Sequence, residues 1–361
     1  MKKYYTTAKY KKINSFKINL SLKKKRRKNI AKINNENRVA QSKEIIQRRE
    51  IVDLKKRYEV IIDPPNNFSL IAETESFNYF ISRIQQTLSE RKSLFIDLIE
   101  LKKLDKSSII VLLAAMVRFR SEKINFNGSI PLNPKIVESF KHSGFFDTLY
   151  MNYEFNNNFV VFSGTKDFIA RGYNLADLSK ALPLIKESSI HIWGHKKRIP
   201  SLYNTIGELM KNTHEHADKS RPGHWNWWIS VLLMDNKKVG FSFVDFGDGI
   251  IESLYNNTDY IEYLLERKAT DQAKIFEEII SGKIQKSGTR EDHRGNGLNS
   301  IYSSFKNGDL CKLIIISNSL KLELNSANDS LHESISRINN QLKGTYIYWE
   351  IDKNTKFLNS L

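Results

Sequence analysis

The sequence contains a single cysteine and no long apolar run. Because Cys311 stands alone among 361 residues, the chain cannot form an internal disulfide. Cys311 begins an apolar stretch that continues over residues 313–316, which predicts a small buried side chain rather than a reactive thiol. The longest apolar candidate, residues 109–117, is too short to span a bilayer, and the N-terminal end lacks the apolar core of a signal peptide. We therefore expect a cytoplasmic protein without a transmembrane segment.

Acidic residues are scarce at the N-terminal end. Residues 1–50 hold 17 Lys and Arg against three acids, which accounts for 14 of the 17 net positive charges. Residues 1–35 have almost no apolar periodicity, so they predict a disordered basic arm. The tyrosines and phenylalanine between the basic residues favour nucleic acid as a partner. An anionic membrane surface and a solubilising tail without a partner are the alternatives.

The rest of the chain divides into a helical connector and two folded domains. Apolar residues spaced along one face predict a helix over 36–57. Alternating strands and helices then predict a small α/β domain over 58–163. Its expected elements are a strand at 58–62, a helix at 76–88, a strand at 94–98, a helix at 107–118, a strand at 124–127, a helix at 134–146 and a strand pair within 150–162 that turns at 156–158.

A second domain is predicted over 172–361, after a boundary near 164–172. Helices are expected to cover one face of a mixed sheet there. The expected elements are a helix at 199–217, strands at 225–235 and 238–245 joined by a turn at Asp235 and Asn236, a helical insertion at 259–280, a helix at 299–305, and strands at 312–317, 321–325 and 344–352.

Glu208 and Asn212 are one turn apart on the first helix of this second domain, so they face the same side. An amide oxygen is a suitable hard ligand for Mg²⁺, which keeps several waters and takes its other ligands from substrate phosphates. A carboxylate one turn away can orient or deprotonate a water or a hydroxyl. Taken alone, the pair is more typical of a solvated helix face.

Asp245 follows an apolar strand directly, and Gly247 and Gly249 come after it. A carboxylate accepts a hydrogen bond from the exocyclic amine of adenine but meets the carbonyl of guanine, so Asp245 can select ATP over GTP. The two glycines allow close approach of the backbone and positive φ angles. In isolation, such a motif is more often a plain turn.

Two further segments complete the candidate site. Arg294, Gly295, Gly297 and Leu298 precede the helix predicted at 299–305, and a glycine-rich approach to a helix N-terminus presents free N–H groups to phosphate. Thr345, at the start of the last strand, has a hydroxyl that can reach a base through water.

Together these segments resemble, in order and spacing, the GHKL superfamily, which includes gyrase B, heat-shock chaperones, histidine kinases and MutL. The resemblance covers about residues 199–351. The boxes that carry it are Glu208-x-x-x-Asn212, Asp245-x-Gly247-x-Gly249, Gly295-x-Gly297-Leu298 and Gly344-Thr345-Tyr346-Ile347.

This resemblance implies a Bergerat-fold pocket for Mg-ATP. Asn212 would chelate Mg²⁺, Glu208 would be the general base, Asp245 would bind adenine, and residues 287–297 would form the ATP lid. Glu215, three residues after Asn212, is similar to the gyrase and chaperone branch and favours hydrolysis. The transducer domain that lends a lysine in that branch is not expected here, so hydrolysis should be slow or need a partner.

Two other site types are less consistent with the pattern. His214 and His216 are two residues apart on a helix and face differently, so we do not predict a zinc site. No phosphoacceptor helix of the histidine-kinase kind precedes Glu208, and the segment around His195 does not match one.

The first domain resembles, more loosely, the STAS domain of anti-anti-sigma factors over residues 58–149. The similarity lies in Asp97 within its strand, and in Asp105 and Ser107 before an apolar helix. In that family a phosphorylated serine directly follows the aspartate, but Lys106 occupies that position here. We therefore predict that Ser107 caps the helix rather than serving as a phosphorylation site. The predicted fold class is α/β (α+β), a STAS-like domain followed by a Bergerat-fold sandwich.

These features predict a Mg-ATP-binding regulatory ATPase that acts as a nucleotide-gated switch on a protein partner or on a second copy of the chain. An anti-sigma-type serine/threonine kinase, in which Glu208 activates a hydroxyl, is the first alternative. A non-hydrolysing ATP sensor is the second.

Overall fold

The computed structural model describes most of the chain beyond residue 47. The described residues are 23–26, 28, 32, 44, 47–150, 159–163, 167–173, 181–216, 226–255, 271–283, 297–327 and 330–355. Contacts divide the chain after Arg57 into two units. In the first unit, most of the basic arm lies outside the described residues, and a helix covers residues 47–55. Both domains predicted from the sequence lie in the second unit.

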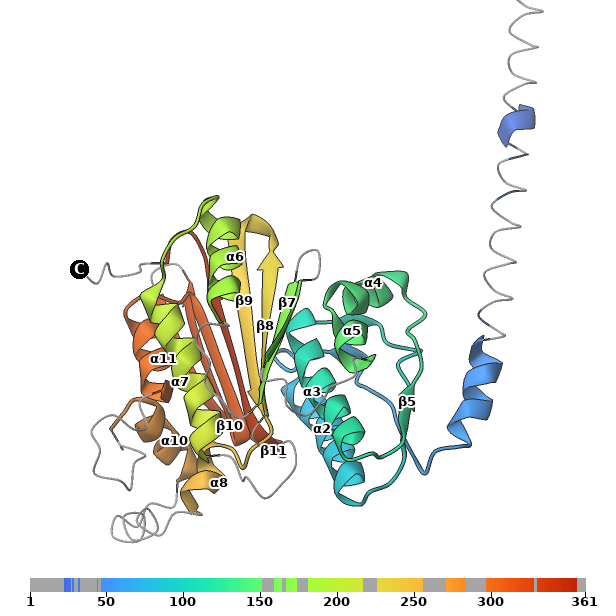
Figure 1. Cartoon of the computed structure of the whole chain (residues 1–361), viewed down its shortest axis with the longest axis horizontal. Coiled ribbons are helices and arrows are strands. Elements are labelled where there is room, and N and C mark those ends of the chain that lie inside the picture. Colours follow the sequence, from blue (N-terminus) through green and yellow to red (C-terminus); the bar gives the residue numbers. More distant parts are fainter. Residues whose placement is uncertain are drawn as a thin grey trace, which may run out of the picture. The chain divides into compact units, whose positions relative to one another are not determined.

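The second unit begins with a small parallel sheet (Figure 1). Its strands follow the predicted alternation with the helices between them, and their order is β1-β3-β5. The elements are β1 (Val60–Ile62), α2 (Thr74–Ser89), β3 (Leu94–Ile96), α3 (Ile109–Ser121) and β5 (Phe126–Gly128), with the short parallel pair β2 (Asn67–Phe68) and β4 (Lys103–Leu104) beside them. The α/β class is therefore confirmed for this part of the chain.

The single helix predicted at 134–146 is two helices, α4 (Pro134–His142) and α5 (Phe145–Tyr150). The helix begins as expected, with Pro134 in its first turn and Asn133 accepting the N–H of Lys135. It ends because Gly144 adopts a φ of 75°, a left-handed conformation that commonly terminates helices.

The larger sheet has six strands in the order β10-β11-β9-β8-β7-β6. All neighbours are antiparallel, so the prediction of a mixed sheet was wrong. The strands are β6 (Phe159–Ser163), β7 (Asp167–Tyr173), β8 (Asn226–Met234), β9 (Lys238–Asp245), β10 (Lys312–Ala327) and β11 (Ser330–Ile351). The turn predicted at 156–158 lies outside the described residues, and the boundary predicted near 164–172 coincides with the β6–β7 hairpin.

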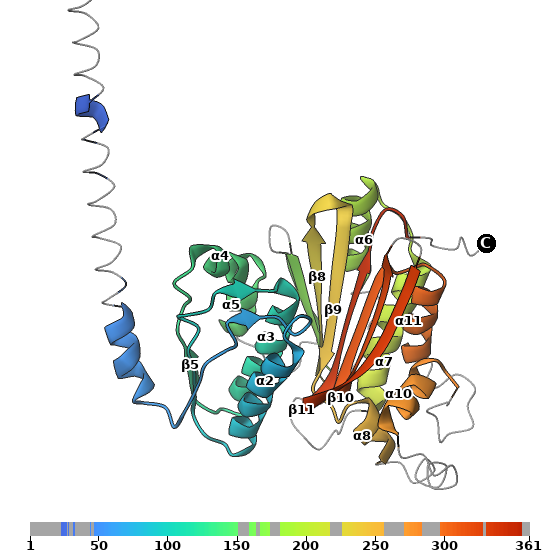
Figure 2. The same cartoon turned by 180° about the vertical axis from the view of Figure 1, so that it is seen from behind.

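Helices cover both faces of this sheet, whereas the sequence predicted cover on one (Figures 1 and 2). Trp227 and Phe243 point to one face, toward helices that follow β7. Trp228 and Val244, next to them in sequence, point to the other and share a core with α2 and α3. The first group of helices is α6 (Ala181–Trp193), α7 (Pro200–His216), α8 (Ile250–Tyr255), α10 (Gln272–Ile280) and α11 (Gly297–Lys306).

The last two strands are longer than predicted. The strands expected at 312–317 and 321–325 form one strand, β10, whose register with β11 shifts around Asn318. Strand β11 begins at Ser330 rather than near residue 344. Residues 331–337 carry mostly polar, exposed side chains, so they lack the apolar alternation that identifies a strand.

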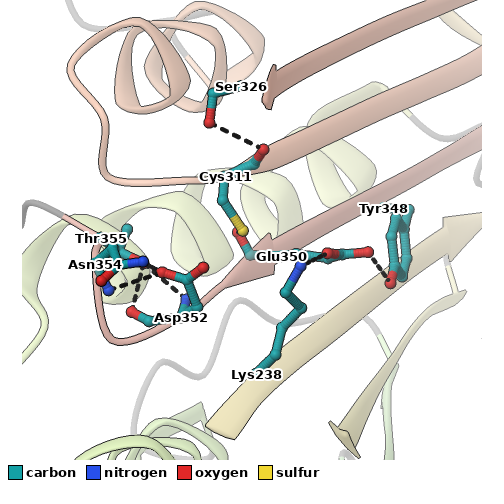
Figure 3. Close-up of polar contacts among 8 residues, drawn as sticks. All are labelled: Lys238, Cys311, Ser326, Tyr348, Glu350, Asp352, Asn354 and Thr355. Carbon is teal, nitrogen blue, oxygen red and sulfur yellow. Dashed lines mark hydrogen bonds and ion pairs between the residues drawn. The ribbon is translucent and has the colours of Figure 1, made fainter. Parts of the chain in front are cut away.

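Cys311 lies at the end of the sheet where β9 begins, beside a polar cluster (Figure 3). Its thiol is partly buried and contacts the carbonyl oxygen of Glu350 at 3.3 Å, and burial raises its pKa to about 12, which fits the expected unreactive thiol. The Glu350 carboxylate pairs with Lys238 at 2.9 Å and accepts the hydroxyl of Tyr348 at 2.8 Å. Burial lowers the pKa of Lys238, but the hydrogen bond and charge of Glu350 outweigh it and raise the pKa overall.

Among the described helices, none is both long and apolar enough to cross a membrane.

Candidate functional site

Helix α7 positions the first predicted pair. Its apolar residues Ile206, Leu209 and Met210 are buried against the sheet, which leaves Glu208 and Asn212 half-buried at the side of the helix. Asn212 borders a cavity between α7 and the sheet, whereas Glu208 is not one of the described residues that line it.

Gly297, the first residue of α11, lies directly against this pair. A Cβ atom at Gly297 would come within 2.4 Å of Nδ2 of Asn212 and 3.0 Å of Cβ of Glu208. A side chain at this position would have to displace Asn212, so the glycine allows α11 to begin beside α7 without moving it. Two segments that the sequence grouped into one site, separated by the whole β8–β9 hairpin, are therefore in contact.

Asp245 ends β9 in the middle of the large sheet. It pairs with Trp227 on β8 and with Thr345 on β11. Its Oδ1 accepts the N–H of Gly247 at 2.9 Å, a local turn that orients the half-buried carboxylate. The last residue of the strand thus presents a fixed carboxylate where the chain leaves the sheet.

Gly344 brings β11 unusually close to the end of β9. It has a φ of 118°, and a Cβ atom there would lie 2.1 Å from the carbonyl oxygen of Asp245. The following residue, Thr345, is buried and borders the same cavity as Asp245. Glycine at this position therefore sets the wall that Asp245 and Thr345 form together.

Sequence reasoning missed Ser317 and Asn318, which hold the loop after Asp245. Asn318 has a φ of 53° at the irregularity of β10, and its amide donates to the carbonyl oxygen of Asp248 at 2.8 Å. Its Oδ1 accepts the N–H of Ile251 at 2.9 Å, and Ser317 Oγ accepts that of Ile250 at 2.8 Å. These bonds from β10 cap the N-terminus of α8. Two polar residues that interrupt an apolar strand were the available signal.

The cavity that these segments enclose has a volume of about 50 Å³. This is far below the roughly 300–1,000 Å³ of pockets that bury whole ligands, so the recess suits one end of a ligand. Its lining combines apolar side chains with carboxylate, amide and hydroxyl groups, which suits a flat heteroaromatic ring with hydrogen-bonding substituents. The lining residues are Leu209, Asn212, Thr213, Phe243, Asp245, Gly247, Asp248, Gly249, Ile250, Ser253, Leu298, Thr345 and Ile347.

Part of the predicted site lies outside the described residues. Arg294, Gly295 and the rest of the predicted lid before Gly297 are outside the described part of the chain. His214 and His216 lie in α7, but their side chains are not described. The described residues include no cluster of three or more His, Cys, Asp or Glu arranged to hold a metal ion. Mg²⁺ needs no such cluster when substrate phosphates supply ligands, so the amide of Asn212 fits a single protein ligand.

Ser107, which the sequence offered as a helix cap or a phosphorylation site, is on the other side of the large sheet. It is 1% exposed, and its carbonyl oxygen accepts the hydroxyl of Tyr346 at 3.3 Å. The prediction that Ser107 caps the helix was wrong: Asp105 caps a short 3-10 turn at residues 106–108 and accepts the N–H of Ser107 at 3.0 Å, and the N-cap position of α3 is Ser108. A buried hydroxyl packed behind the sheet is a poor phosphate acceptor in this conformation.

The chain matches no protein-family model, no curated protein and no solved structure.

Proposed function

We propose that this protein binds Mg-ATP in the cavity between α7 and the large sheet and acts as a nucleotide-gated regulatory ATPase of the GHKL type. The observation that carries the proposal is the convergence of four separate segments at one recess. Asn212, Asp245, Gly249, Leu298 and Thr345 all border it, although each was selected from the sequence alone.

The cavity chemistry supports adenine as the group that enters the recess. Phe243, Leu298 and Ile347 provide apolar surface for the faces of the base. Asp245 would accept the exocyclic amine, and its orientation by Gly247 lowers the entropic cost of that hydrogen bond. Thr345, whose backbone pairs with Asp245, would add a hydroxyl at the edge of the base.

Glu208 and Asn212 would act at the phosphate end of the ligand. Mg²⁺, when bound with the nucleotide, would neutralise charge that develops on the phosphates. Asn212 would hold the ion, and Glu208 would accept the proton of an attacking water. Gly297 keeps both side chains beside the start of α11, so a shift of α11 would displace both of them.

Contacts on the other face of the sheet support a regulatory role. Helix α2 holds the part of β11 that leads into Gly344: Glu75 accepts the N–H of Asn339 at 2.8 Å, and Gln85 donates to the carbonyl oxygen of Lys343 at 3.1 Å. A shift of β11 at Gly344 on ligand binding would therefore change the hydrogen bonds between β11 and α2.

Binding of ATP to the full chain with Mg²⁺ tests the proposal directly. Asp245→Asn should weaken ATP binding about tenfold or more while GTP binds weakly to both forms, because the variant loses a charged acceptor. Asp235→Asn, an exposed position at the far end of the same hairpin, is the matched control. Failure of the unaltered chain to bind ATP would refute the proposal.

The fate of the γ-phosphate then distinguishes the possible reactions. Free phosphate with ADP, abolished by Glu208→Gln while ATP binding persists, is the expected result for a hydrolysing switch. Label transferred to protein would indicate a kinase, and because Ser107 is buried its acceptor should lie elsewhere. Binding without either product would identify an ATP sensor.

A further inference from the structure

A second, larger cleft lies at the start of α7, away from the residues that border the proposed nucleotide site. Its volume is about 770 Å³, within the range of pockets that bury small ligands. Helix α6, the loop after it and the first turns of α7 form its walls. No residue of this cleft belongs to the cavity bordered by Asn212 and Asp245.

The cleft combines apolar walls with a cationic rim. Leu182, Ile185, Ile199 and Tyr203 supply apolar surface, and Leu182 is 53% exposed.

The rim carries four cations, Lys186, Lys196, Lys197 and Arg198, against one acid, Glu187. Within the described part of the chain, Lys186, Lys196 and Arg198 form no ion pair. Like charges this close in sequence repel one another, and a bound anion would relieve that repulsion.

The loop that carries three of these cations is held in place. Gly194, with a φ of 79°, ends α6 and donates its N–H to the carbonyl oxygen of Ile190 at 2.8 Å. Further along, the N–H of Lys197 donates to Ser189 Oγ at 3.1 Å, and its ammonium lies 4.7 Å from the centre of the Trp193 ring. An ordered loop loses little backbone entropy when a ligand binds, so the backbone that carries these cations is preorganised.

We propose that this cleft binds a small amphipathic anion, with its acidic head at the loop of Lys196 and Arg198 and its apolar body against Leu182, Ile199 and Tyr203. The volume favours a small molecule, and the charge of the rim requires an anionic head rather than a neutral one. This inference does not depend on nucleotide binding.

Calorimetric titration of the full chain with octanoate tests the proposal, with octanol and acetate as matched probes that lack the charge or the tail. Octanoate should bind saturably at one site, octanol about tenfold more weakly, and acetate not measurably. The double variant Lys196→Gln/Arg198→Gln should weaken octanoate binding about tenfold and leave octanol unchanged. Leu182→Asn should weaken both.

Exposed positions elsewhere provide the controls. Lys274→Gln on α10 and Leu331→Asn on β11 remove similar side chains from exposed sites and should leave octanoate binding unchanged. Circular dichroism should show that every variant keeps its secondary structure. Absence of saturable octanoate binding up to about 10 mM, equal binding of octanol, or wild-type affinity in the double variant would each overturn the proposal.

Discussion

At the residue scale, Gly344 has no room for a side chain, since an added Cβ would collide with the backbone of Asp245. We expect Gly344→Ala to lower the free energy of unfolding by roughly 3 kcal/mol or more, through strain at a positive φ and forced separation of two strands. Urea unfolding of the full chain measures this change.

Gly194 provides the control for that substitution. Its φ is also positive, at 79°, but nothing lies within 4 Å of an added Cβ. Gly194→Ala should therefore cost only the conformational term, about 1–2 kcal/mol. Equal losses at the two positions would mean that the close approach of β11 to β9 contributes little.

Gly297 separates nucleotide binding from stability. The methyl group of Gly297→Ala would meet chiefly the end of the Asn212 side chain, which can rotate away at little cost in stability. The added methyl would nevertheless displace Asn212 and Glu208, so ATP affinity should fall about tenfold or more while the melting temperature changes little. Ser300→Ala on the same helix is the control, and a variant that binds ATP normally would contradict the proposed phosphate end of the site.

At the element scale, helices and strands with a clear apolar pattern were predicted well. Strand β9 has the predicted bounds, and α7 differs by one residue at each end. Helix α6 was missed because it has both apolar and small polar residues on its buried side, including Ser188 and Ser189, so no sharp apolar stripe marks it.

The long-range cap of α8 could not be predicted from local sequence, because Asn318 acts across strands on a helix far earlier in the chain. Asn318→Gly keeps the positive φ and removes only the side chain. We expect a loss of about 1–3 kcal/mol and faster amide exchange at Ile251 and Glu252, whose N–H groups lose the Oδ1 acceptor of Asn318. Asn325→Ala on the same strand should leave exchange at these residues unchanged, and equal exchange in both variants would refute the cap.

Strand β11 makes stability depend on pH in the alkaline range. Burial raises the pKa of Tyr346 and Tyr348 well above the usual value, so both stay protonated in the folded chain. The unfolded chain loses these protons above about pH 10, so their contribution is complete below that pH and falls as pH rises, by about 1.4 kcal/mol per pH unit for each tyrosine.

Urea unfolding between pH 8 and pH 11 measures this dependence. The double variant Tyr346→Phe/Tyr348→Phe should have a shallower decline of stability above about pH 10. Tyr79→Phe, at a position 51% exposed, is the control and should retain the full decline. A double variant with the original slope would show that other groups control alkaline unfolding.

At the scale of the whole molecule, the segments predicted as two domains share a core. Phe80 on α2 belongs to the same apolar cluster as Trp228 and Tyr346 of the large sheet. The sequence predicted each part from local patterns, but which sheet face a helix covers depends on contacts between distant segments. Helix α3 carried the available signal, because it is apolar on almost every side and so needs neighbours all round it.

A shared core predicts a single cooperative unfolding unit over residues 58–361. Phe80→Ala should cost about 3–5 kcal/mol and lower the protection of the slowest amides in β8 and β9 as much as those in α3. Native-state hydrogen exchange measures both sets of amides. If only the amides of the small parallel sheet and its helices lost protection, the two parts would be independently stable.

The candidate site was predicted unevenly for a similar reason. Asp245 and Asn212 were identified because their chemistry is evident from local motifs, and both border the cavity. Ser317 and Asn318 were not, since they support the loop after Asp245 from a strand that is distant in sequence. Residues that would contact a ligand can be recognised from their type and local motif. Residues that only hold them in place cannot be recognised in this way.

The pairing of Asp245 with Thr345 has a consequence for the order of folding during synthesis. Strands β8 and β9 are made as a pair, whereas β11, the second partner of β9, is made only after α8, α10, α11 and β10. Until then β9 has an open edge, which is a template for pairing with other chains. The large sequence separation also slows closure of the sheet. A nascent chain of this protein should therefore depend on chaperones until its last strand has been made.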